Sequence, residues 1–77
     1  MAAPDKFNVT ALADEVLRNP NPGTRKIALQ GLSIYMRYER IAELVRYVSQ
    51  RDSNAEVRET AANLLAASIE KLAASDI

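Results

Sequence analysis

The sequence feature that most constrains the fold is a seven-residue pattern that occurs twice, 33 residues apart. The first copy reads Asn19-Pro20-Asn21-Pro22-Gly23-Thr24-Arg25, and the second reads Asp52-Ser53-Asn54-Ala55-Glu56-Val57-Arg58. An alanine and a leucine follow each arginine at the same spacing, as Ala28 and Leu32 and as Ala61 and Leu65. An internal period of this length in a helical chain is typical of stacked helix pairs, each packed against its neighbour.

The first copy of the pattern predicts the boundary between two helices. Pro20 disfavours a helical conformation at the residue before it, so a helix over about 9–18 should end there. Asn21 is suited to cap a new helix whose first residue is Pro22. We therefore expect the second helix over about 22–36.

The second copy predicts another helix boundary, with two candidate caps. Ser53 followed three residues later by Glu56 is a capping-box pattern, and Asn54 is a competing cap. The segments on either side carry apolar residues at helical spacing. We therefore expect helices over about 39–50 and 54–73.

The boundary between the second and third helices depends on the repeat alone. Residues 24–50 contain no proline, so periodicity would permit one long helix. The repeat instead predicts a break near residues 37–38. One unbroken helix over residues 24–50 would contradict the repeat.

The apolar spacing predicts an all-α fold, because no segment alternates apolar and polar residues as a strand does. We expect two antiparallel helical hairpins stacked side by side in a single domain over residues 1–77. The first repeat would cover about 8–37 and the second about 38–73. The expected core takes one apolar stripe from each helix: Leu12, Val16, Ile27, Ala28, Leu32, Leu44, Val45, Val48, Val57, Ala61, Leu65 and Ile69.

The repeated pattern resembles the signature of HEAT repeats, in which a turn like Asp-Pro-Asp-Pro-Glu-Val-Arg leads into the second helix of each pair. The resemblance spans about residues 8–72 as two repeats, and the copy that begins at Asp52 is the closer match. In the first copy, Asn19 stands where an acidic residue is usual and Thr24 where an aliphatic residue is usual. The resemblance implies a fragment of an α-solenoid.

The resemblance also implies structural and binding roles for individual residues. The arginine after the turn commonly ties neighbouring repeats together through the turn carboxylate, which would place Arg25 or Arg58 against Asp52. The second helix of each pair commonly faces partner proteins, so the chain is expected to be a protein-binding module or scaffold. That surface would comprise Lys26, Gln30, Ser33 and Arg37 from the first repeat, and Glu59, Asn63 and Glu70 from the second.

The composition excludes several kinds of catalytic and metal site. The chain has no Cys and no His, which rules out disulfides, Cys/His zinc sites, cysteine nucleophiles and histidine acid–base catalysis. Glu39 and Glu43 lie one helical turn apart, but we interpret them as solvated partners of Arg40 and Arg46. We therefore expect no catalytic residue, no cofactor and no metal, and a protein that is not an enzyme.

A net charge of zero conceals a basic middle segment between acidic flanks. Arginines and tyrosines alternate within this segment, at Tyr35, Arg37, Tyr38, Arg40, Arg46, Tyr47 and Arg51. Such side chains can bind phosphates and stack on bases, and they are also enriched at protein interfaces. A small nucleic-acid-binding protein is therefore the alternative function, although such domains usually carry a clear positive excess.

The last helix predicts an interface. It places apolar surface on more than one side, through Leu64, Leu65, Ala66, Ala67, Ile69, Leu72 and Ala73. Because two repeats have little interior, we expect this helix to form a homodimer or to dock onto a larger protein. No apolar run is long enough to span a membrane and no signal-peptide pattern is present, so we expect a soluble, cytoplasmic protein without a membrane partner.

Overall fold

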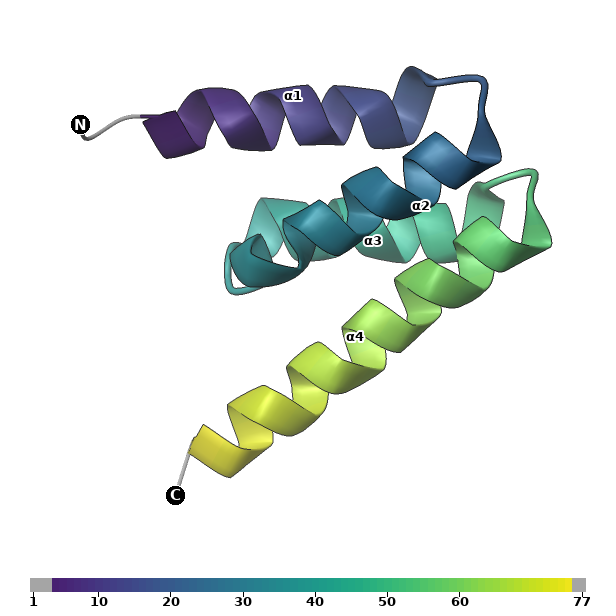
Figure 1. The fold of residues 1–77 in the computed structure, drawn as a ribbon. Coiled ribbons are helices and arrows are strands. Elements are labelled where there is room, and N and C mark those ends of the chain that lie inside the picture. Colours follow the sequence, from purple (N-terminus) through teal and green to yellow (C-terminus); the bar gives the residue numbers. More distant parts are fainter. Residues whose placement is uncertain (1–3, 76–77) are drawn as a thin grey trace.

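A computed structural model describes residues 4–75 of the chain, and the side chains of residues 9–69. Within this range the chain is all-α, as predicted, and contains no strand. The elements are α1 (Pro4–Arg18), α2 (Pro22–Gly31), the short 3-10 helix η1 (Leu32–Tyr35), α3 (Glu39–Arg51) and α4 (Ala55–Ser75) (Figure 1). The four expected helices are therefore present, and the first begins earlier than its apolar spacing suggested.

The predicted boundary between the second and third helices is confirmed. After Gly31 the chain tightens into η1, and residues 36–38 turn it toward α3. In this turn the backbone N–H of Tyr38 donates to the Tyr35 carbonyl at 3.0 Å. Tyr38 has an extended backbone, and its carbonyl accepts the first hydrogen bonds of α3. Residues 24–50 are therefore not one continuous helix.

Asparagine caps start α2 and α4 in the same way. The Oδ1 of Asn21 accepts the backbone N–H groups two and three residues later, at 2.8 and 3.3 Å. The Oδ1 of Asn54 does the same at 2.9 and 3.0 Å. The alternative cap at Ser53 is therefore wrong, because the Asp52 side chain binds the Asn54 N–H and brings that asparagine to the capping position.

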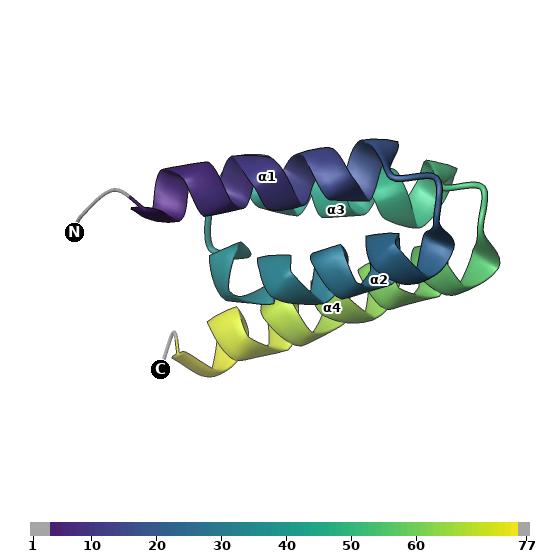
Figure 2. The same ribbon diagram turned by 45° about the horizontal axis from the view of Figure 1, so that its top comes forward.

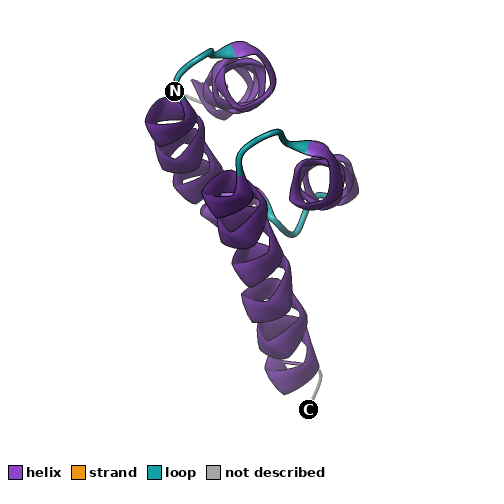
Figure 3. Ribbon diagram, turned by 90° about the vertical axis from the view of Figure 1, so that its right-hand side faces the viewer, coloured by secondary structure: helices purple, strands orange, loops and turns teal. Residues whose placement is uncertain are grey.

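The helices pack as two contacting pairs. α1 lies against α2 and α3 lies against α4, while α2 also lies along α4 (Figures 1 and 2). Figure 3 shows α2 and α4 on one side of the molecule and α1 and α3 on the other. The turns at residues 19–21 and 52–54 lie at the same end of the molecule (Figure 1). The two copies of the repeated pattern are thus neighbours in space.

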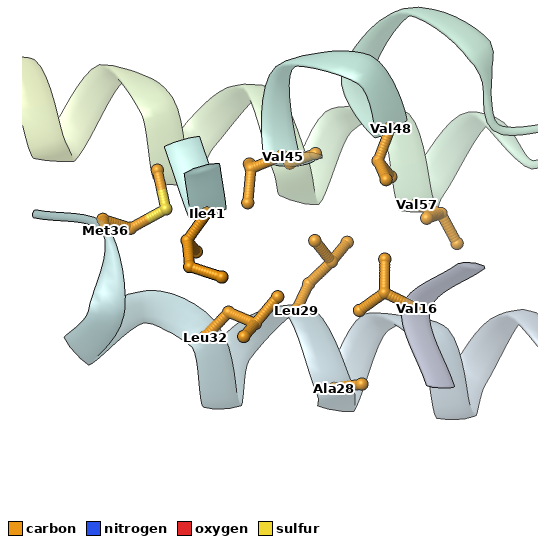
Figure 4. Packing of buried hydrophobic residues seen from close by; sticks show 10 residues of the cluster. Val16, Ala28, Leu29, Leu32, Met36, Ile41, Val45, Val48 and Val57 are labelled. Carbon is orange, nitrogen blue, oxygen red and sulfur yellow. The ribbon is translucent and has the colours of Figure 1, made fainter. Parts of the chain in front are cut away.

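The core lies between the helix pairs and is entirely apolar. Its buried side chains are Val16, Ala28, Leu29, Leu32, Met36, Ile41, Val45, Val48, Val57 and Ala61 (Figure 4). Three further residues of the expected core, Leu12, Leu44 and Leu65, are half-buried at its edge. α1 approaches α2 closely at Gly31, where a Cβ would lie 3.2 Å from the end of the Leu12 side chain and would require that side chain to shift.

Two residues of the expected core are wrong. Ile27 is 70% exposed and Ile69 is 66% exposed. On α2 the expected Ala28 is buried, and Leu29 is buried in the place of Ile27, because this helix packs against both α1 and α4. Met36 also enters the core, because η1 carries the chain back toward α3.

Candidate functional site

A buried ion pair joins the two copies of the repeated turn. Arg25 on α2 donates through Nε and Nη2 to the two carboxylate oxygens of Asp52, at 3.0 and 2.9 Å. Its Nη1 donates to the carbonyl of Asn19 at 2.8 Å. The two side chains are only 10% and 8% exposed. This two-pronged arrangement, in the place that the resemblance implied, fixes the first turn against the second.

Asp52 is held in its charged form. Burial raises the pKa of its carboxyl group, but the hydrogen bonds from Arg25 and from the Asn54 N–H lower it. The positive charges of Arg25 and Arg58 lower it further, so the pKa of Asp52 lies below its ordinary value. The carboxylate is therefore ionised at neutral pH and pairs with a permanently charged guanidinium.

Arg58 occupies in the second turn the place that Arg25 occupies in the first, but it has fewer partners. Its Nη1 donates to the carbonyl of Asp52 at 2.7 Å, as the Nη1 of Arg25 does to Asn19. In the part of the chain that the structure describes, no carboxylate lies within ion-pair distance of Arg58. The two arginines thus share a backbone contact and differ in their carboxylate contact.

The polar residues expected to meet partners form two rows, the first running from α2 through η1 into the following turn and the second on α4, which lies beside α2. The first row holds Lys26, Gln30, Ser33 and Arg37, and the second holds Glu59 and Asn63. All of these side chains are exposed except that of Lys26, which is half-buried. The Glu70 side chain of the second row lies outside the described side chains.

Lys26 is withdrawn from solvent by an ion pair that the sequence did not reveal. Its Nζ donates to Glu56 Oε1 at 3.1 Å, which links α2 to α4. Acidic residues are favoured at the start of a helix, so the position of Glu56 alone accounts for its presence in the sequence. Its contact with Lys26, 30 residues away, could therefore not be inferred from the sequence. The contact adds a second, exposed link between the two helix pairs.

The arginines and tyrosines of the basic segment form two separate groups rather than one patch. At the start of α3, the Arg37 guanidinium lies 6.0 Å from the Tyr38 ring, which in turn stacks on Tyr35 at 6.5 Å. At its end, the Arg51 guanidinium lies 5.9 Å from the Tyr47 ring. Nine residues of chain separate the two groups, or about 13 Å of helix. In each group, the arginine lies over a tyrosine ring of the same group.

The remaining arginines of α3 point to solvent. Arg40 and Arg46 are exposed, and so are Glu39 and Glu43. Within the described residues, no ion pair joins either glutamate to either arginine. The expected solvation of these four residues is therefore observed, but the expected pairing is not.

An open cavity of about 350 Å³ lies where both turns meet the ends of α1 and α3. The Arg25–Asp52 pair forms part of its wall, with Leu17, Tyr47 and Arg51 around it. Among the described side chains, every buried polar atom has a hydrogen-bond partner. The cavity therefore offers no unpaired buried group for chemistry.

The described part of the chain offers neither a metal-binding cluster nor a membrane-spanning helix. Among the described residues, acidic side chains nowhere gather in the groups of three that could hold a metal ion. None of the described helices is long and apolar enough to cross a membrane.

No protein-family model, curated protein or solved structure matches this chain. Function is therefore inferred from the chain's own surfaces.

Proposed function

We propose that this chain is a small, non-catalytic protein–protein interaction module built from two HEAT-like repeats. In this proposal α1 with α2 and α3 with α4 are antiparallel hairpins, stacked as in a short α-solenoid. The observation that carries the proposal is the buried Arg25–Asp52 pair, which joins the two copies of one turn. The matching asparagine caps and the contact of α2 with α4 support it.

The binding surface in this proposal consists of the two polar rows on α2 and α4. The first row ends in the cation Arg37, whereas the second begins with the anion Glu59, and both side chains are exposed. Two exposed charges of opposite sign select a partner by electrostatic complementarity and set its orientation. We infer a partner that places an acidic group toward Arg37, in the turn after η1, and a basic group toward Glu59 on α4.

We propose no catalytic role, because the described residues contain no unpaired buried polar side-chain atom. The buried charged side chains of Arg25 and Asp52 neutralise each other. In the same part of the chain, acidic side chains do not gather into a group that could hold a metal ion. Recognition by surface shape and charge is the function that remains.

Site-specific photo-crosslinking tests this proposal in the cells that normally produce the protein. A benzophenone amino acid would replace Gln30 or Asn63, with Ala11 as the matched control because it is exposed on α1. We expect discrete protein adducts from the two row positions and none from the control. The absence of adducts, or the same adducts from all three positions, would refute the proposed surface.

A small nucleic-acid-binding protein is the alternative, favoured by the exposure of Arg40 and Arg46 on α3. An electrophoretic mobility shift across a salt series separates the two functions, because phosphate contacts weaken steeply as salt rises. We expect no specific shift. Salt-sensitive binding that is lost in Arg40→Ala and Arg46→Ala would favour the alternative.

A further inference from the structure

One stripe of α2 and η1 is covered by the second half of the chain. It consists of Arg25, Leu29, Leu32 and Met36, which are 9%, 0%, 0% and 6% exposed. Figure 4 shows Leu29 of α2 and Leu32 of η1 pointing toward Ile41 and Val45 of α3. The arginine at the head of the stripe meets Asp52 from the turn that precedes α4. We call these four residues the covered stripe.

The equivalent stripe of α4 is largely open, although Leu65 packs against the edge of the core. Thirty-three residues after the covered stripe stand Arg58, Ala62, Leu65 and Ile69, which we call the open stripe. Their spacing places them on one face of the helix. Ile69 is 66% exposed, Ala62 is also exposed, and Leu65 and Arg58 are half-buried. The open stripe keeps the arginine and the apolar character of the covered one, yet no described residue covers it in the same way.

We propose that the open stripe docks a partner protein through a helix pair whose turn carries a carboxylate for Arg58. The internal Arg25–Asp52 contact supplies the template, and the inference rests on the proposed function as an interaction module. The Asp52 carbonyl holds Nη1 of Arg58 at 2.7 Å. In Arg25 the same backbone contact leaves Nε and Nη2 free to bind two carboxylate oxygens. Arg58 therefore presents the same two donors to an incoming acidic turn.

A second copy of this chain is a poorer occupant of the open stripe. Its first helix pair would present Asn19 in the place of Asp52, so Arg58 would meet no anion. The Asn19 side chain is already engaged, since its oxygen accepts the Asn21 N–H at 2.8 Å and its nitrogen donates to Glu15 at 2.7 Å. The copy would also place Glu15 where the second pair places Val48, which is 2% exposed. Burying that carboxylate against an apolar stripe is unfavourable.

The test uses a tethered copy of the second helix pair as the probe. In the extended chain, residues 1–70 are followed directly by a copy of residues 38–77. This join keeps the 33-residue period, so the copy of Asp52 lies at position 85. The natural chain has no cysteine, so Ala62→Cys reports cover of the open stripe through its rate of reaction with a maleimide. Asn63→Cys, exposed at the next position, is the matched control.

We expect maleimide labelling of Ala62→Cys to be about tenfold slower, or more, in the extended chain than in the 77-residue chain. Labelling of Asn63→Cys should change by less than about twofold. In the extended chain, replacing the copied aspartate by asparagine, or the substitution Arg58→Met, should raise the labelling rate of Ala62→Cys by roughly threefold or more. Equal rates in the two parent chains, or protection that survives both substitutions, would overturn the proposal.

Self-association is a separate outcome of the same assay. If labelling of Ala62→Cys in the 77-residue chain slows as its concentration rises, a second copy covers the stripe and our choice of partner is wrong. The result is also independent of the crosslinking test. Crosslinked adducts at Gln30 and Asn63 without protection of Ala62→Cys from maleimide would refute this inference and leave the proposed function standing. Protection of Ala62→Cys without crosslinked adducts would refute the polar binding surface instead.

Discussion

Asp52→Asn should destabilise the protein far more than Asp14→Asn, although each substitution removes one carboxylate from an arginine. The two ion pairs have similar lengths, 2.9 Å for Arg25–Asp52 and 3.0 Å for Arg18–Asp14. They differ in burial. The side chains of the first pair are 10% and 8% exposed, whereas those of the second are 80% and 61% exposed. The comparison therefore sets a buried, two-pronged pair against an exposed pair with a single contact.

The expected magnitudes follow from this difference in burial. Removing one partner of a buried pair costs about 3–5 kcal/mol, because the other charge is left buried and unpaired. Asparagine at position 52 retains one oxygen that can accept from Arg25 or from the Asn54 N–H, so we expect a loss of about 2–3 kcal/mol. An exposed pair one helical turn apart contributes only about 0.3–0.5 kcal/mol. In a domain of this size the larger loss lowers Tm by roughly 10–20 °C.

The assay is urea unfolding of the wild type and both variants, followed by far-UV circular dichroism. The denaturant dependence of the unfolding free energy should be the same for all three proteins, so that the midpoints report stability. Adding Arg25→Met to Asp52→Asn should cost less than the sum of the two single substitutions. Equal losses for Asp52→Asn and Asp14→Asn, or strict additivity in the cycle, would refute the structural role assigned to the pair.

Three further predictions concern pH, packing and capping. Because the folded-state pKa of Asp52 lies below its unfolded value, the stabilisation by its carboxylate is complete at neutral pH and is lost as pH falls below about 4. Urea midpoints measured over a pH series should fall in this range for the wild type and should fall less for Asp52→Asn. Leu29→Ala should lower the unfolding free energy by about 2–5 kcal/mol, whereas Ile27→Ala should change it by less than about 0.5 kcal/mol; comparable losses in urea unfolding would contradict the observed burial. Asn54→Ala should lower thermal stability by about 1 kcal/mol and Ser53→Ala should leave it nearly unchanged, and the reverse order would restore the capping-box interpretation.

The parts of the fold that the sequence predicted well depend on local signals. Pro20 stops α1, Pro22 and Asn21 start α2, and each acts within a few residues of chain. The period of 33 residues added one long-range prediction, a break before α3, which local composition could not supply. The resemblance to HEAT repeats, rather than the period, implied a contact of Arg25 or Arg58 with Asp52, and the structure shows it for Arg25.

The parts that the sequence did not predict depend on how helices are rotated against their neighbours. The segment of α2 and η1 has apolar residues on two faces, since Leu29 is fully buried while Ile27 and Ile34 are 70% and 73% exposed. A helical period cannot choose between such faces, because both satisfy the same spacing. The difference between the covered and open stripes likewise required the exposure of Leu29 and Ala62 to be compared in the folded chain.

The most direct test of the interaction-module proposal is amide chemical-shift mapping of the full chain with the purified protein captured by crosslinking. We predict perturbations along the two polar rows, centred on Gln30 and Asn63, with a second set at Arg58 and Ala62 on the open stripe. The amide of Ala11, an exposed residue of α1 outside both surfaces, should not shift. Perturbations centred instead on Arg40 and Arg46 of α3 would contradict the proposal.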